Sequence, residues 1–135
     1  MSALDGAVEL DPALRELISL RASVLNGCAY CVDRHTLDAA ARGEHTQRLY
    51  AVATWHEAPF FTGRERAALA LTDAVTLITD GRVPAEIFDA ARAQFGDEEL
   101  AQLLWAITVI NAYNRIAVAT RMLPGEYRPA GAAGR

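Results

Sequence analysis

Two cysteines and one histidine are the residues of this chain whose types and spacing could do chemistry. Cys28, Cys31 and His35 form a Cys-x-x-Cys-x-x-x-His pattern, and the sequence contains no third cysteine. Residues three and four apart lie on the same face of a helix, so a helix beginning near Cys28 would place both thiols and the imidazole in one stripe. The pattern predicts either thiol redox chemistry or a metal site.

The redox interpretation depends on the closeness of the two thiols. A disulfide needs Cα atoms about 4.4–6.8 Å apart, which two cysteines at a helix start can satisfy. The reactive species is the thiolate, and two local features favour it here. The positive end of the helix favours a thiolate at Cys28, whereas His35, one turn beyond Cys31, can accept the proton of Cys31. The residues alone therefore leave open which cysteine attacks first.

A metal site is the alternative use of the same side chains. Thiolates and imidazoles bind zinc, so Cys28, Cys31 and His35 could supply three ligands. A structural zinc site generally has four protein ligands, and the sequence has no second Cys-x-x-Cys and no paired histidines. We therefore expect no bound metal and no cofactor.

The composition is that of one compact domain. The chain has 135 residues, 52% of them hydrophobic and 22% charged, and a formal net charge of −4. Basic and acidic residues are interspersed, so no basic stripe is available for a nucleic-acid backbone. No apolar run is long enough to span a bilayer, and the first residues lack a signal-peptide pattern. We expect a single cytoplasmic domain over residues 1–135 that binds neither nucleic acid nor membrane.

Helix start and stop signals recur along the whole chain. Asp11-Pro12 is a typical helix start, Asn26-Gly27 a typical stop, and Thr62 with Glu65 matches a capping box. No stretch alternates apolar and polar residues as a half-buried strand does, so we expect an all-α protein of about six helices. The expected helices cover residues 12–26, 28–42, 46–55, 63–80, 85–94 and 98–121. Residues 128–135 are expected to form a mobile tail.

The cysteine segment and its surroundings resemble the AhpD-like proteins of the carboxymuconolactone decarboxylase superfamily, which include alkylhydroperoxidases. The matching signature is Glu16, then Cys28-Ala29-Tyr30-Cys31, then His35, in the family's order and close to its spacing. Residues 50–76 and 103–115 also resemble the small AhpD-like proteins, so the resemblance covers most of the chain. It implies the AhpD-like helical fold.

The resemblance also implies a thiol-dependent peroxidase cycle of the peroxiredoxin type. By family analogy Cys31 attacks a hydroperoxide and becomes a sulfenic acid, and Cys28 condenses with it to a disulfide. A dithiol donor then reduces the disulfide by exchange. His35 would be the base for Cys31, and Glu16 a member of the proton relay. The implied partners are a hydroperoxide substrate and a dithiol reductant, and the implied role is antioxidant.

One position departs from the family's pattern. Some alkylhydroperoxidases of this group carry a further histidine between the two cysteines, where this chain has Tyr30. Tyrosine can donate a hydrogen bond but is a poor base at neutral pH. Two alternative functions stay open beside the peroxidase: a redox-sensing or metal-binding module without turnover, and a cofactor-free decarboxylase or lactone-acting enzyme on the same fold.

Self-association is a further implication of the resemblance. The family forms trimers or hexamers whose sites lie near subunit contacts, so we expect a homo-oligomer. Apolar contact surface could come from Trp105, Ile107 and Ile110, or from the Phe60-Phe61 loop.

Overall fold

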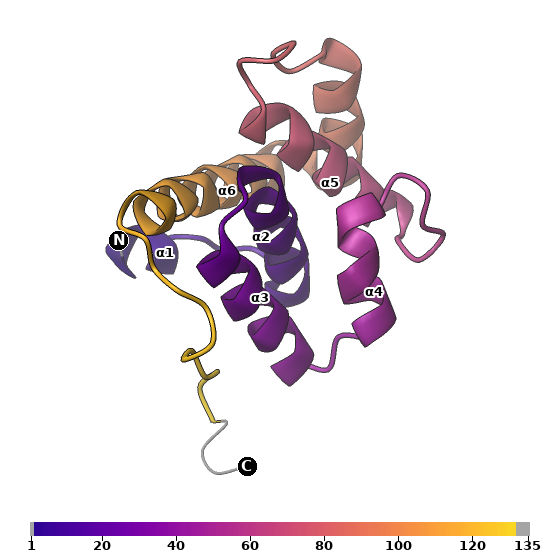
Figure 1. The fold of residues 1–135 in the computed structure, drawn as a ribbon. Helices are drawn as coiled ribbons and strands as arrows, with labels where there is room; N and C mark the ends of the chain where they lie inside the picture. Colours follow the sequence, from indigo (N-terminus) through magenta and orange to yellow (C-terminus); the bar gives the residue numbers. More distant parts are fainter. Residues whose placement is uncertain (1, 132–135) are drawn as a thin grey trace.

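A computed structural model describes residues 2–131, which contain six α-helices, one short 3₁₀ helix and no β-strand. The expected all-α architecture of about six helices is confirmed (Figure 1). The helices are α1 (Ser2–Gly6), α2 (Pro12–Asn26), α3 (Ala29–Ala41), α4 (Thr46–Ala51), the 3₁₀ helix η1 (Val52–Thr54), α5 (Gly63–Thr76) and α6 (Ala85–Ala119). None of the described helices is apolar enough over sufficient length to cross a bilayer.

Helix α2 is the element on which the others pack. It contacts α3 on one side and α5 and α6 on others (Figure 1). Its bounds follow the signals in the sequence: the Asp11 carboxylate accepts a hydrogen bond from the amide of Leu14 at 3.0 Å, and Pro12 is the first helical residue. Gly27 ends it with a left-handed backbone, φ 65°, which glycine adopts without a Cβ clash.

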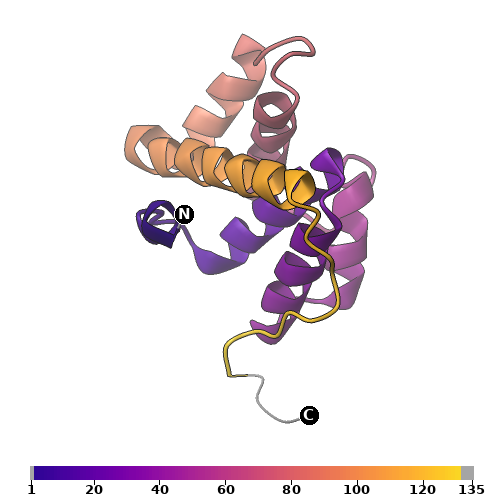
Figure 2. The ribbon, with the colours of Figure 1, turned by 60° about the vertical axis from the view of Figure 1, so that its left-hand side comes forward.

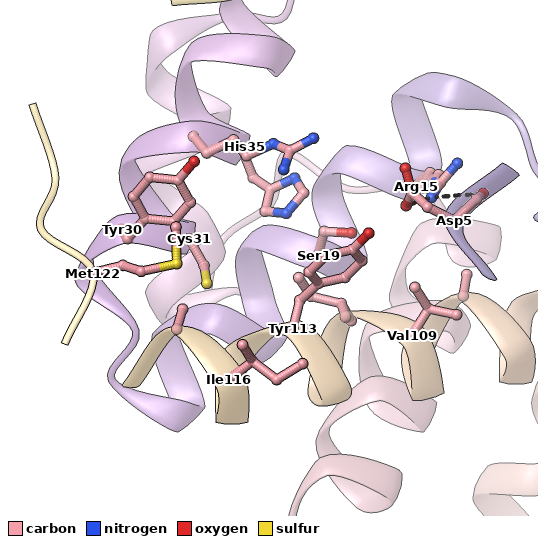
Figure 3. A pocket seen from close by; sticks show the side chains of 14 residues that line it. Asp5, Arg15, Ser19, Tyr30, Cys31, His35, Val109, Tyr113, Ile116 and Met122 are labelled. Atoms are coloured by element: carbon pink, nitrogen blue, oxygen red, sulfur yellow. Dashed lines mark hydrogen bonds and ion pairs between the residues drawn. The ribbon is translucent and has the colours of Figure 1, made fainter. Parts of the chain in front are cut away.

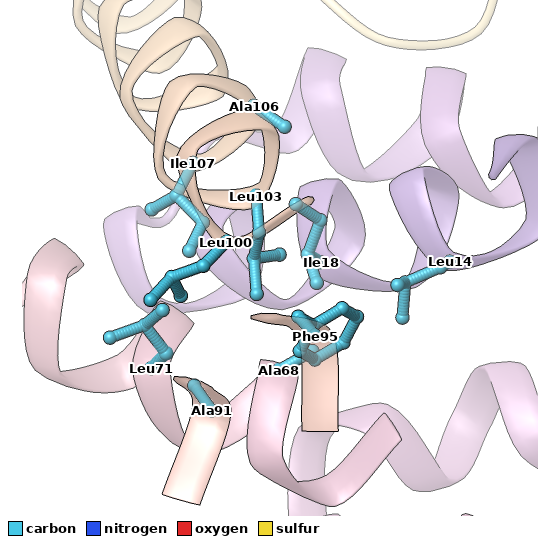
Figure 4. Close-up of a cluster of buried hydrophobic side chains, with 10 residues drawn as sticks. All are labelled: Leu14, Ile18, Ala68, Leu71, Ala91, Phe95, Leu100, Leu103, Ala106 and Ile107. Carbon is cyan, nitrogen blue, oxygen red and sulfur yellow. The ribbon is translucent and has the colours of Figure 1, made fainter. Parts of the chain in front are cut away.

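The larger hydrophobic core joins α2 and α5 to both halves of α6. Figure 4 shows Ile18 of α2 facing Leu103 and Ile107 of α6, with Phe95 closing one side of the cluster. Complete burial of one such side chain contributes about 1.5–3 kcal/mol to the free energy of unfolding. This core therefore fixes the position of α6 relative to α2, which is the helix that precedes the cysteines.

A second core holds α3 and α4 against α2 and α5. Its members are Leu17, Leu20, Ala39, Leu49, Val52, Trp55, Ala58, Phe61 and Leu69. A buried polar contact lies beside it, because Arg21 Nε is 2.6 Å from Asp73 Oδ1 and the Trp55 indole donates to Asp73 Oδ2 at 3.1 Å. The paired charges tie α2 to α5 around the apolar cluster.

Several helix boundaries differ from those expected. Residues 46–55 are not one helix, because the backbone tightens into η1 after Ala51. Helix α5 ends at Thr76 and not near Asp80; Leu77 and Ile78, which follow it, are exposed and gain little by continuing the helix. The expected break at Gly96 is present as a kink inside α6, where φ is 71° and ψ 178°.

The chain after α6 returns along α3 (Figure 2). The amide of Gly125 donates to the Asp33 carboxylate at 2.9 Å, and the Tyr127 hydroxyl donates to Asp38 at 2.8 Å. Residues 128–131 have no helix or strand, and residues 132–135 of the expected mobile tail lie outside the described residues. Mobility of this tail stays a prediction.

The expected contact surface needs one correction. Ile107 and Ile110 are 0% and 4% exposed, because they face the interior of the subunit, so neither is available for a subunit contact. Trp105 and Phe60 are each 38% exposed and remain candidates. The sequence of a strongly apolar helix does not indicate which side is exposed. The exposed side can be identified only from the elements that pack against the helix.

Candidate active site

Cys28 and Cys31 form a disulfide at the start of α3. Their Cα atoms are 5.3 Å apart, within the range that the spacing predicts. Cys28 is the N-cap residue, and its Sγ accepts a hydrogen bond from the Cys31 amide at 3.3 Å. Both residues are buried. Because that amide is one of the unpaired donors of a helix start, it would also stabilise a thiolate at Cys28.

A buried polar network holds the turn before Cys28. The Asn26 amide donates to the side-chain oxygens of Asn111 and Asn114, both at 2.9 Å. Asn114 is fully buried and donates to the Ser23 hydroxyl at 3.0 Å, and the Ser23 carbonyl accepts from the Cys28 amide at 3.0 Å. The network therefore connects α6 to the end of α2 and to the first cysteine.

His35 and Glu16 meet across the α2–α3 pair. His35 Nδ1 lies 2.8 Å from Glu16 Oε2, and the two side chains are 17% and 11% exposed. A carboxylate partner places the ring proton on Nδ1, which leaves Nε2 as the basic atom of a neutral imidazole. The arrangement can therefore accept a proton at Nε2 while Glu16 stabilises the resulting cation.

Further charges surround this pair. Arg42 Nε is 3.9 Å from Glu16 Oε1, and Arg34 Nε is 3.7 Å from Asp38 Oδ2. Burial raises the pKa of Tyr127, and its hydrogen bond to Asp38 raises that pKa further. The phenol of Tyr127 therefore remains a donor to Asp38 at neutral pH.

One group of potential metal ligands occurs within residues 2–131: Glu16, His35 and Asp38 offer atoms within 4.8 Å of one another. It does not include the cysteines, whose sulfurs in the disulfide offer no thiolate. Guanidinium groups already lie near both carboxylates. The arrangement of Glu16, His35 and Asp38 therefore suits a proton relay better than the binding of a metal ion.

Cys31 and His35 line the same cavity, whereas Cys28 does not. This Cys31 cavity has a volume of about 180 Å³ and lies between α3 and α6 (Figure 3). Figure 3 places Tyr30 and Met122 beside Cys31 at one end and the paired Asp5 and Arg15 at the other. The α6 side of the wall is apolar apart from Tyr113: Ala106, Val109, Ile110, Ile116 and Ala117.

Cys28 opens onto a different depression on the opposite side of α3. This Cys28 groove has a volume of about 710 Å³ and is walled by α2, α3 and the α4–η1 segment. Its lining residues are Leu20, Ser23, Val24, Gly27, Cys28, Ala29, Val32, Asp33, Thr36, Leu37, Leu49, Tyr50 and Ala53. The two residues of one disulfide thus line two separate depressions.

The structure brings Glu16, His35 and both cysteines into one region, as the sequence suggested, and adds residues that the sequence did not indicate. Arg15, Ser19 and Tyr113 line the Cys31 cavity from α2 and α6. Their spacing in the chain bears no relation to the cysteine motif, so no sequence signal could have marked them. Tyr30 lies inside the motif itself, and its position in the cavity wall follows from its place on the same face of α3 as Cys31.

Comparison with known proteins agrees with this fold. Residues 1–74 match the model of the carboxymuconolactone decarboxylase family. An uncharacterised protein of Bacillus subtilis (strain 168), YdfG, is 44% identical over 105 residues, which cover 78% of this chain and 71% of YdfG. The chain belongs to the carboxymuconolactone decarboxylase family.

Two solved structures share the fold. A protein of unknown function from Agrobacterium tumefaciens, provisionally assigned as the antioxidant defence protein AhpD, is 40% identical with a TM-score of 0.90, covering 93% of this chain and 88% of that one. An uncharacterised peroxidase-related protein from Ralstonia eutropha JMP134, described as an alkylhydroperoxidase AhpD core, is 26% identical with a TM-score of 0.77, covering 93% and 68%. The fold is thus AhpD-like.

Proposed function

We propose that this protein is a thiol-dependent hydroperoxidase, or disulfide oxidoreductase, whose working residues are Cys31, Cys28, His35 and Glu16. The observation that carries the proposal is the shared cavity of Cys31 and His35, with His35 held by Glu16 and with Cys28 close enough to bridge Cys31. The names given to the two AhpD-like structures support the same chemistry.

The oxidative half of the cycle takes place at Cys31. Its thiol gives a proton to Nε2 of His35, and the thiolate attacks the terminal oxygen of a hydroperoxide. The O–O bond breaks, the alcohol leaves with a proton from the imidazolium, and Cys31 becomes a sulfenic acid. The Cys28 thiolate then attacks the Cys31 sulfur, the S–O bond breaks, the departing hydroxide takes a proton from solvent and leaves as water, and the disulfide forms. A dithiol donor restores both thiols by exchange.

The surroundings of the two sulfurs support this division of roles. Cys31 faces the cavity that has an imidazole and apolar walls, which suits an organic hydroperoxide with a carbon body. Cys28 faces away from that cavity and accepts the Cys31 amide, so its thiolate would be stabilised while it awaits the sulfenic acid. We assign Cys31 as the attacking cysteine and Cys28 as the resolving one.

We also propose that the protein works as a homo-oligomer, a trimer or hexamer. Trp105 and Ile116 are both exposed and lie three turns apart on one side of α6, and a second copy would cover this apolar surface. Ile116 also lines the Cys31 cavity, so an interface there would border the site. Analytical ultracentrifugation at several concentrations tests this, and a monomer at all concentrations would rule it out.

A peroxide-consumption assay with a panel of dithiol donors tests the proposed reaction. We expect turnover of cumene hydroperoxide by the wild type and none by Cys31→Ser. Cys28→Ser should consume about one equivalent of peroxide and stop as a sulfenic acid that dimedone labels. Two unreactive thiols in the reduced wild type would sink the proposal. A reaction that survives both serine substitutions would instead favour cysteine-independent chemistry such as decarboxylation.

A further inference from the structure

We propose that the reducing thiol enters through the Cys28 groove and attacks Cys28 Sγ, so that the two half-reactions use opposite faces of α3. The occupant of the groove would be an unbranched dithiol without a negative charge. Because the attacked disulfide is the product of the proposed peroxidase cycle, the proposal rests on that function and specifies its reductive half.

The two faces of α3 separate the two depressions. Positions 30, 31, 34 and 35 line the Cys31 cavity, whereas positions 29, 32, 33, 36 and 37 line the Cys28 groove. At 100° per residue these sets fall on opposite sides of the helix, and no residue belongs to both linings. The two residues of the disulfide therefore line depressions on different sides of α3.

The direction of approach decides which sulfur is attacked. In thiol–disulfide exchange the attacking thiolate approaches the central sulfur from the side opposite the leaving sulfur. A thiolate in the groove therefore meets Cys28 Sγ, with Cys31 as the leaving group. A thiolate arriving from the other side would have to enter the smaller cavity, where Tyr30 and Met122 flank Cys31 (Figure 3).

The exchange steps balance with a dithiol and nothing else. The donor thiolate bonds to Cys28 Sγ, the Cys28–Cys31 bond breaks, and Cys31 leaves as a thiolate, which takes a proton from water. The donor's second thiolate then attacks the donor sulfur of the mixed disulfide and releases Cys28 as a thiolate, which takes a proton from water. The donor ends as its own disulfide, and the cysteine pair is reduced by two electrons.

The groove selects its occupant by charge and by width. Among the described residues that line it, Asp33 is the single charged side chain, and most of the others are apolar. An anionic thiol would meet this carboxylate without a compensating cation, at a cost that salt reduces. Cys28 is only 2% exposed, so a thin carbon chain reaches its sulfur more easily than a bulky one. Both features favour an unbranched donor that carries no negative charge.

Mapping the mixed disulfide tests which sulfur is attacked. Wild-type protein is oxidised with diamide, so the experiment does not require peroxidase activity. It is mixed with excess 2-mercaptoethanol, quenched with acid at several early times, alkylated and digested at arginine. The peptide of residues 22–34 contains both cysteines, and its fragment ions separate them. When the ratio of adducts is extrapolated to zero time, we expect at least five adducts on Cys28 for each one on Cys31. An equal distribution, or an excess on Cys31, overturns the proposal.

Two bulky substitutions test the separation of the depressions. Ala53→Trp fills the groove at an exposed lining position, and Ile116→Trp fills the cavity at another. We expect Ala53→Trp to slow reduction of the diamide-formed disulfide by dithiothreitol at least fivefold and to leave single-turnover oxidation of the thiols by peroxide within twofold. Ile116→Trp should slow oxidation of the thiols by peroxide at least fivefold and leave reduction of the disulfide by dithiothreitol within twofold. Slow reduction in Ile116→Trp together with normal reduction in Ala53→Trp would contradict the proposal.

A matched pair of thiols tests the charge preference. 2-Mercaptoethanol and 2-mercaptoethanesulfonate differ at the end remote from the thiol, where one is neutral and the other anionic. At equal thiolate concentration, the neutral compound should reduce the disulfide at least fivefold faster than the anionic one. Asp33→Asn should decrease this ratio of the two rates. Equal rates in the wild type would refute the charge preference. If diamide-formed disulfide behaves as expected but peroxide does not oxidise the thiols, only the proposed peroxidase function fails.

Discussion

Glu16 Oε2 lies 2.8 Å from His35 Nδ1, and this contact joins two helices through residues 19 positions apart in the chain. It orients the imidazole along the face of α3 that lines the Cys31 cavity. The same contact fixes the ring proton on Nδ1 and leaves Nε2 to receive a proton from the cavity. Glu16 does not line that cavity, so we regard it as a positioning residue that acts through His35.

Replacing Glu16 by Gln should slow peroxide-dependent oxidation of Cys31. Gln can still contact Nδ1 but lacks the negative charge that stabilises a His35 cation, so we expect a loss of about 10–100-fold, typical of such supporting partners. The measurement is the single-turnover rate of oxidation as a function of pH. The part of this pH profile that depends on the catalytic base should shift in Glu16→Gln. Arg42→Gln is the control, because its guanidinium is 3.9 Å from Glu16 and outside the cavity; it should change the rate less than threefold. An unchanged pH profile in Glu16→Gln would exclude a role for Glu16 in the relay.

Replacing Tyr30 by His should accelerate the same step at neutral pH. Tyr30 lines the cavity beside Cys31, and an imidazole there could exchange protons near pH 6.5, whereas a phenol cannot. We expect kcat/KM for an organic hydroperoxide to rise about three- to tenfold, which is a small part of the range of general acid–base catalysis. Tyr30→Phe separates the phenol's hydrogen bonding from its bulk and should change kcat/KM less than threefold. A slower Tyr30→His enzyme would mean that the tyrosine itself assists the reaction.

Replacing Asn114 by Ala should destabilise the protein strongly. Asn114 is fully buried and bonded to both Asn26 and Ser23, so its loss removes two hydrogen bonds and leaves a cavity below the cysteine turn. We expect the free energy of unfolding to fall by about 2–4 kcal/mol. Urea titration gives the value. Thr108→Ala is the control on the same helix, since Thr108 is exposed and donates only to the Leu104 carbonyl, and it should cost less than about 0.5 kcal/mol. Similar decreases in the free energy of unfolding in both variants would show that the buried network contributes no more to stability than an exposed hydrogen bond.

Glu65 should make stability fall in acid. Burial alone would raise the pKa of Glu65, but hydrogen bonds from Arg48 and from Thr62 outweigh it and hold that pKa below its ordinary value of 4.5. A carboxyl with a depressed pKa stabilises the fold above its unfolded-state value and loses that contribution as pH falls through the lower folded value. The Gln side chain of Glu65→Gln can still accept the hydrogen bond from the Thr62 amide but has no charge, so the substitution should cost about 1–2 kcal/mol at pH 7.

The pH dependence gives the check on this assignment. The stability difference between the wild type and Glu65→Gln should be constant from pH 7 to about 5 and should shrink below pH 4.5. Urea titrations at several pH values measure it. Glu99→Gln is a matched control, because its ion pair with Arg64 is more exposed, so the difference from wild type should be small at every pH. A Glu65 difference that does not depend on pH would rule out the ion pair as its source.

Local sequence determined the helices and the cysteine pair of this protein. Helix caps depend on contacts a few residues apart, so Asp11, Gly27 and Thr62 could be assigned their positions from the sequence. The bridging distance of Cys28 and Cys31 likewise follows from their separation of three residues at a helix start. The end of α5 was misplaced, because Leu77 and Ile78 continue the apolar pattern and only the surrounding structure leaves them exposed.

Contacts between distant segments were decided by the tertiary structure alone. The approach of Glu16 to His35 was anticipated by family resemblance and not by any local pattern, since it depends on how α2 packs on α3. Ile107 faces inward because α2 and α5 cover that side of α6, and Ile110 is buried where α6 borders the Cys31 cavity, neither of which the nearly uniform apolar sequence of α6 reveals. The assignment of Cys31 to the smaller cavity and Cys28 to the larger groove has the same origin. The Cys31 cavity joins α3 to α6, far apart in the chain, whereas the Cys28 groove lies between the consecutive elements from α2 to η1, and in both cases the packing of the helices decides which cysteine lines the depression.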